Sequence, residues 1–204
     1  MFSVNFNIFI RSSILEVVMV SYIYISATFG TVTLAANQIL LHFLSIAAYV
    51  LDGFAFLAEV LVGISLANRS KKSVREAVKK CTIFAVSGAL FFSIFFFFFG
   101  ANLIAMMVIR QIVREIANQY LFWAAITPVT GVFAWILDGI FIGSTETSYM
   151  KKAMVQAFIF YCGVFFILNI FGSNHAFWAS INLFLLARAY FLFRYYPRIT
   201  RNSY

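Results

Sequence analysis

Six long apolar segments dominate this sequence of 204 residues. Short polar segments separate them, and their approximate limits are 12–30, 36–66, 79–100, 116–143, 153–172 and 175–193. A helix needs about 20 mostly apolar residues to cross the hydrocarbon core of a membrane. Each segment has about this length or more, and the stretch FFSIFFFFFG at 91–100 suits contact with lipid on every side. The sequence therefore predicts an all-α integral membrane protein with six transmembrane helices, forming a single domain over residues 1–204.

The composition supports this prediction, because 63% of the residues are hydrophobic and only 11% are charged. Soluble domains are usually about 45–50% apolar and about 25% charged. The net charge of +8 could suggest nucleic-acid binding in a soluble protein, but its distribution follows the predicted spans. All but two of the 15 Lys and Arg residues fall on one side of the membrane, a set that includes Arg11 and Arg188. Arg110 and Arg114 fall on the other side.

This asymmetry predicts the orientation of the chain. Loops rich in Lys and Arg stay in the cytoplasm, so six spans place both termini on the cytoplasmic side. We therefore expect a multi-pass protein of the cell membrane, the inner or plasma membrane. The basic segment 69–80 is expected to contact anionic lipid headgroups rather than nucleic acid.

Four acidic residues lie inside the predicted spans: Glu16, Asp52, Glu59 and Asp138. A charge at the bilayer centre costs about 2.5–3.5 kcal/mol, so such residues mostly face protein or water. Asp52 and Glu59 are seven residues apart and share one helix face. Counting back by sevens adds Ser45 and Gln38, and the resulting stripe is about 31 Å long. This polar stripe predicts a helix that lines a water-accessible cavity; the alternative is hydrogen-bonded packing against other helices with the acids protonated.

The segment LDGIFIG at 137–143 repeats the Leu-Asp-Gly of LDGFAF at 51–56. A glycine beside an acid lets a neighbouring backbone approach closely, or lets the helix deform around an ion. Pro128 lies earlier in the same span, as a bending transport helix would need. Glu16 has two interpretations: it reaches towards the interface near Arg11, or it faces the cavity with the other acids.

No sequence pattern indicates an enzyme. The chain lacks the metalloprotease, nucleophile-elbow, phosphate-binding and dinucleotide-binding motifs. Cys81 and Cys162 are expected to be small apolar residues of the helices, and neither His42 nor His175 has a companion suited to a metal site. We therefore expect no cofactor and no metal ion, and any transport would draw its energy from an ion gradient.

Three segments carry a family resemblance, and they are 34–63, 135–147 and 183–197. They resemble the C-terminal half of transporters of the MATE (multidrug and toxic compound extrusion) family, nearest its DNA-damage-inducible F branch. The similarity extends from about Ile8 to Pro197. It implies one lobe of a carrier whose twelve helices form two lobes of six around a central substrate cavity. It further implies export of cationic or amphipathic drugs in exchange for protons or sodium ions.

The same resemblance implies roles for particular residues. Asp52, Glu59 and Asp138 would belong to the cavity-facing acids of this lobe, and Asn37 and Gln38 match the start of the family's eighth helix. Glu16 lies where other branches have an ion-binding acid close by.

The expected partners follow from the missing lobe. They are membrane lipids, an organic cation as substrate, and either a separate N-terminal lobe of six helices or a second copy of this chain. The alternative is a truncated membrane protein that does not transport, or an assembly partner. A lipid-precursor flippase is a third possibility, but it would need a basic cavity, and these acids predict an acidic one.

Overall fold

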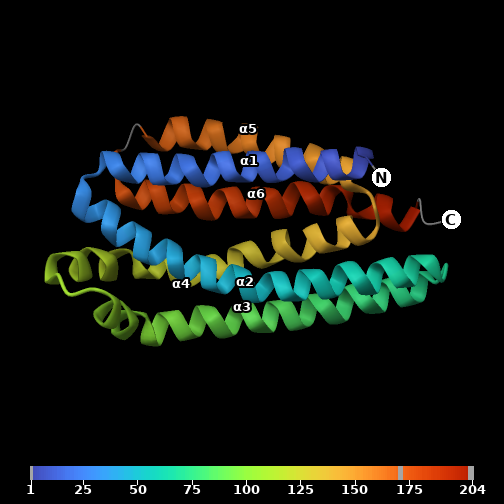
Figure 1. Cartoon of the computed structure of the whole chain (residues 1–204), viewed down its shortest axis with the longest axis horizontal. Coiled ribbons are helices and arrows are strands. Elements are labelled where there is room, and N and C mark those ends of the chain that lie inside the picture. Colours follow the sequence, from blue (N-terminus) through green and yellow to red (C-terminus); the bar gives the residue numbers. More distant parts are fainter. Residues whose placement is uncertain (1, 170–171, 202–204) are drawn as a thin grey trace.

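The computed structural model describes residues 2–169 and 172–201, and these residues form long helices (Figure 1). The helices are α1 (Phe2–Thr28), α2 (Thr31–Ala67), α3 (Lys71–Met107), α4 (Gln111–Gly143), α5 (Thr147–Asn169) and α6 (Asn174–Arg201). All six are long and apolar enough to cross a membrane. The expected all-α fold with six transmembrane helices is therefore confirmed. Residues 170–171, at the end of the predicted span 153–172, lie outside the described residues.

The helices extend beyond the apolar segments predicted from the sequence. Helix α1 begins at Phe2 rather than near residue 12, and α3 begins at Lys71 rather than near residue 79 and ends at Met107 rather than near residue 100. The Ser70 side chain accepts a hydrogen bond of 3.2 Å from the Ser73 backbone N–H and so caps this helix. Both α2 and α3 contain 37 residues, which corresponds to about 55 Å. Since the hydrocarbon core is about 30 Å thick, these two helices also extend into the headgroup regions and the water beyond.

The helices run up and down, and both termini lie at the same end of the molecule (Figure 1). Helices α2, α3 and α4 pack against one another, while α1 packs mainly against α5 and α5 packs against α6. Contact between α4 and α6 joins the two groups. Helix α4 is the most buried of the six, and it continues through Pro128 without a break in the assigned helix.

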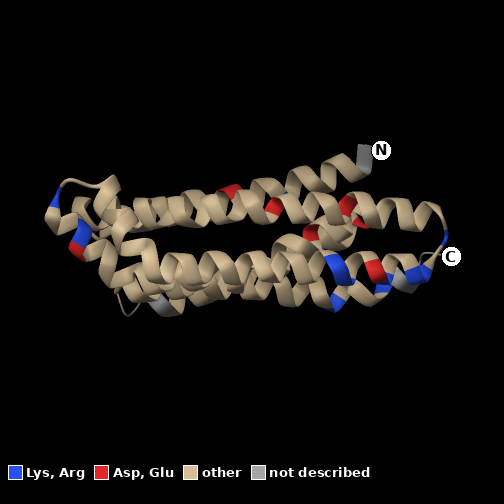
Figure 2. Ribbon diagram, turned by 90° about the horizontal axis from the view of Figure 1, so that it is seen from below, with Lys and Arg blue, Asp and Glu red and all other residues tan. Residues whose placement is uncertain are grey.

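Basic residues gather at the end that holds both termini, and few lie at the opposite end (Figure 2). The turn after α2 and the turn after α4 are also at the basic end, because α2 and α4 both run towards it. The fold therefore places the charges as the sequence predicts, with Arg110 just before α4 and Arg114 in its first turn, at the far end.

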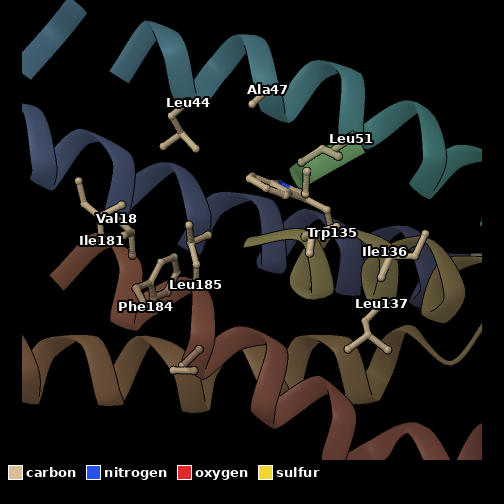
Figure 3. Packing of buried hydrophobic residues seen from close by; sticks show 14 of the residues in the cluster. Val18, Leu44, Ala47, Leu51, Trp135, Ile136, Leu137, Ile181, Phe184 and Leu185 are labelled. Carbon is tan, nitrogen blue, oxygen red and sulfur yellow. The ribbon is translucent and has the colours of Figure 1, made fainter. Parts of the chain in front are cut away.

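Apolar side chains fill the space between the helices. Figure 3 shows Leu44 and Leu51 of α2, Trp135 of α4 and Phe184 of α6 among the residues of this core. The α2–α4 contact is so close that it requires glycine. A Cβ atom at Gly139 would lie only 2.7 Å from the carbonyl carbon of Ala55, and one at Gly143 only 2.9 Å from the carbonyl carbon of Glu59.

The two glycines are four residues apart and so lie on one face of α4, the small-residue spacing that lets membrane helices approach. Of the two roles that the sequence left open for a glycine beside Asp138, the structure therefore supports close backbone approach. The first Leu-Asp-Gly segment differs, because a Cβ atom at Gly53 would meet nothing within 4 Å.

Candidate functional site

A cluster of charged side chains lies inside the bundle, where α1, α4 and α6 meet. Asp138 of α4 accepts hydrogen bonds at its Oδ2 atom from the Nη2 groups of both Arg11 (α1) and Arg188 (α6). The Arg188 bond is 2.6 Å long. The side chains of Asp138 and Arg188 are only 7% and 2% exposed, whereas that of Arg11 is 16% exposed. Asp138 therefore lies in a buried ion-pair cluster.

Asp52 of α2 adds a second carboxylate to this cluster. It is half-buried, and its charge interacts attractively with Arg11 and Arg188 and repulsively with Asp138. With both acids ionised, two positive and two negative charges balance. Such a balance matters in a membrane, because an uncompensated buried charge is strongly destabilising.

The polar stripe on α2 lies at the edge of the core. Its four members have intermediate exposure, and they are Gln38, Ser45, Asp52 and Glu59. Each follows directly after a buried residue of the same helix, so the stripe runs beside the seam that α2 forms with its neighbours. The Ser45 hydroxyl donates to the Leu41 carbonyl 3.0 Å away, within its own helix. The partial exposure of the stripe is compatible with a cavity lining, and the cavity itself stays a prediction.

Asn37, which the resemblance placed in the site, is instead the centre of a buried hydrogen-bond network. Its amide nitrogen donates to the Ser26 hydroxyl and to the Asn174 side chain, each at 2.7 Å. Its carbonyl oxygen accepts from Asn174 and from the Trp178 indole, each at 3.0 Å. All hydrogen-bonding capacity of an amide side chain is then used. Asn37 therefore ties α2 to α1 and α6, and the lobe leaves it no free polar atom for a ligand.

Glu16 is separate from the buried charges. It is exposed on α1, five residues from Arg11, and residues five apart on a helix do not share a face. Arg11 pairs with Asp138 instead. His42 is exposed, and His175 accepts a 3.1 Å hydrogen bond from the Trp123 indole at the far end of the bundle.

Arg11 and Arg188 were not predicted as members of the site, because both were interpreted only as charges that determine the membrane topology. The signal was present for Arg188, which lies within the predicted span 175–193 and between apolar residues. An arginine in such a position needs a carboxylate partner, and Asp138 was available.

An apolar groove lies between the C-terminal halves of α1 and α5, with a volume of about 710 Å³. Aromatic residues line much of it, among them Tyr24, Phe165 and Phe166. On its wall the hydroxyls of Ser21 and Tyr161 are hydrogen-bonded at 2.8 Å. Among the described residues, no charged side chain lines this groove, so it differs in chemistry from the charged cluster nearer the basic end.

Comparison with known proteins agrees with this architecture. The family model MatE matches residues 8–171. The DNA damage-inducible protein F of Escherichia coli (strain K12) is 30% identical over 201 residues, a match that covers 98% of this chain and 44% of the relative. The chain thus spans less than half the length of this curated relative. Together, the family match, the 30% identity and the six membrane-spanning helices show that this chain belongs to the MatE (MATE) family and has the architecture of one six-helix lobe.

Proposed function

We propose that the chain is the C-terminal lobe of a secondary antiporter that exports cationic or amphipathic drugs in exchange for protons or sodium ions. Family membership supports a transporter of the MATE type. The observation that carries the proposal is the charged cluster of Asp52, Asp138, Arg11 and Arg188 within the membrane-spanning helices. Ionisable groups at such depth are costly and mark ion or substrate pathways.

Asp52 is the acid that we assign to the exchange of cations. Its side chain is only half-buried, whereas Asp138 is almost fully enclosed. A carboxylate in a setting of low dielectric constant attracts an organic cation or a proton strongly, and only one of these can neutralise it at a time. Competition for one carboxylate would couple entry of the ion to release of the drug. Glu59 and Gln38, at other levels of the stripe, would provide further polar contacts along the path.

The apolar groove is suited to bind the apolar part of an amphipathic drug. Its volume is within the range of about 300–1,000 Å³ that is usual for small-molecule pockets. Its aromatic rings can hold flat apolar groups and can attract a cation through their π faces. We expect substrates that combine an aromatic body with a positive charge.

Alternating access needs two lobes that move around a shared site. We therefore propose that this lobe works with an N-terminal six-helix lobe or with a second copy of the chain, in the inner or plasma membrane with both termini in the cytoplasm. We expect neither a catalytic activity nor a cofactor. The alternative is a membrane protein that does not transport and serves as an assembly partner.

The test is ethidium efflux from cells that express the chain alone or together with an N-terminal lobe of the same family. We expect efflux in the paired cells, and loss of that efflux in Asp52→Asn. Ser45→Ala is the matched control, since it alters the same stripe without removing a charge, and it should retain efflux. Efflux by Asp52→Asn at the wild-type rate would refute the role of this acid. No efflux in any pairing would favour the assembly partner.

A further inference from the structure

Asp138 is already occupied by two cations that belong to the protein. Both guanidinium groups donate to the same oxygen atom, Oδ2. The negative charge of Asp138 is therefore already compensated by two guanidinium groups, and an external cation binds here only in competition with one of the arginines. The two arginines are equal in charge, so their burial and their packing decide which of them can leave.

Arg188 is held in place. Its side chain is 2% exposed, and its guanidinium carbon lies 5.9 Å from the centroid of the Phe184 ring, one helical turn away on α6. Helix α6 also packs directly against α4, which carries Asp138. Moving Arg188 would require its passage through the packed core of the lobe.

Arg11 is held less firmly. Its side chain is 16% exposed, and its helix packs mainly on α5, while α1 and α4 make little contact apart from this ion pair. The Nε atoms of both arginines are buried and have no hydrogen-bond partner among the described residues, so exposure and helix packing are what distinguish Arg11 from Arg188. A second carboxylate is also within its electrostatic reach, because Asp52 interacts with Arg11.

We propose that Arg11 is an internal cation that occupies Asp138 in the resting lobe and competes with the transported cation for this carboxylate. This inference rests on the proposed function and assigns it a specificity-determining residue. A cation that has entered at Asp52 moves on to Asp138, and Arg11 moves in the opposite direction, from Asp138 towards Asp52. The exchange replaces one positive charge at Asp138 by another, while Arg188 stays paired with this acid throughout. A neutral ligand cannot replace Arg11 in this way, and the site therefore selects cations.

The experiment measures how fast the Asp138 carboxyl reacts with dicyclohexylcarbodiimide in the purified full chain in lipid nanodiscs, with peptide mass spectrometry as the readout. The exposed carboxyl of Glu16 serves as the internal reference. Tetraphenylphosphonium is the probe cation, and its protection of Asp138 gives an apparent dissociation constant. Arg11→Gln removes the internal cation, Arg11→Lys keeps the charge, and Arg110→Gln removes a charge at the opposite end as the matched control.

We expect Arg11→Gln to react faster at Asp138 and to bind the probe about tenfold more tightly, the change expected when one charge-assisted hydrogen bond no longer competes. Arg11→Lys should be close to the wild type, and Arg110→Gln should match it. Thermal unfolding of each variant checks that it is folded, and an unfolded Arg11→Gln is replaced by Arg11→Met in the same assay.

Three results would overturn the inference. They are unchanged reactivity of Asp138 in Arg11→Gln, equal protection by the probe with and without Arg11, and no protection in any variant. The efflux assay with Asp52→Asn is independent of these measurements. Failure of the competition with retained efflux thus refutes the role of Arg11 alone, and loss of efflux in every pairing refutes the proposed function.

Discussion

Replacing Gly139 by alanine should separate α2 from α4. The added Cβ atom would lie 2.7 Å from the carbonyl carbon of Ala55 and 3.0 Å from its Cα atom. Non-bonded carbon atoms normally approach to about 3.5–4.0 Å, so the two backbones must move apart by about 1 Å. Neither partner is a flexible side chain that can turn away. The strain therefore falls on the α2–α4 contact, the most extensive helix pair of the lobe.

The size of the effect follows from this geometry. Overpacking of a well-packed core costs about 1–3 kcal/mol, and a clash between backbones belongs at the upper end of this range. For chains of 150–250 residues, 1 kcal/mol lowers the melting temperature by about 2–4 °C. We therefore expect Gly139→Ala to melt roughly 6–12 °C below the wild type.

Cys81 offers a direct readout, because it is 1% exposed in α3 and becomes reactive when the bundle opens. The melt is followed with a thiol-reactive fluorophore after Cys162, which is exposed, has been replaced by serine. Gly53→Ala is the matched control, since its Cβ atom would meet nothing within 4 Å. It should melt within about 2 °C of the parent, as helix-surface substitutions usually do. Equal melting temperatures for Gly139→Ala and the parent would show that α2 and α4 are not in this close contact.

Three further outcomes follow from the structure. Asn37→Ala should lower the free energy of unfolding by about 2 kcal/mol or more, because Trp178 and its neighbours lose their hydrogen-bond partner. The control Gln38→Ala should lower it by less than about 0.5 kcal/mol. Denaturant titration of tryptophan fluorescence measures both values, and similar values would contradict the hydrogen-bond network. Asp138→Asn should cost about 3–5 kcal/mol by leaving the buried Arg188 without its carboxylate partner. Adding Arg188→Met should recover part of this loss in the same titration, and no recovery would refute the ion pair. In the folded wild type, a membrane-permeant maleimide should modify Cys162 and spare Cys81, and mass spectrometry that finds Cys81 modified first would contradict the packing of α3.

The sequence was sufficient to predict the membrane fold, because apolar segments of helix length have few other solutions. The helix limits were predicted less well. Residues 71–78 are polar, so an apolar pattern cannot include them, although Ser70 caps a helix that begins there. Helix formation depends on capping and hydrogen bonding as well as hydropathy, and these continue into water.

The site was predicted in part. The spacing of Asp52 and Glu59 correctly indicated a shared face of α2, since helical periodicity depends only on local geometry. The pairing of Asp138 with Arg11 depends on how the helix groups of α1 and α4 assemble, over a separation of 127 residues. No local pattern encodes such a contact. The same reason explains Asn37, whose partners Asn174 and Trp178 are more than 130 residues away.

The two Leu-Asp-Gly segments illustrate the limit of motif reasoning. Their letters agree, but Gly139 is packed against the Ala55 backbone and Gly53 is exposed. Asp138 is likewise enclosed and Asp52 half-buried. The identical tripeptides differ because α4 is surrounded by other helices and α2 lies at the edge of the lobe.

The account depends on water and ions reaching the polar stripe of α2 from within the membrane, and a cysteine scan tests this most directly. Single cysteines replace Gln38, Ser45, Asp52 and Glu59 in a chain without its two natural cysteines, and a positively charged, membrane-impermeant thiol reagent is added from either side. We predict labelling at these positions, and none at the buried Leu51 or at Val50 and Val60, which are apolar and exposed on other faces of α2. If all four stripe positions resist the reagent from both sides, with and without a partner lobe and a substrate cation, the stripe is sealed and the antiporter account is wrong.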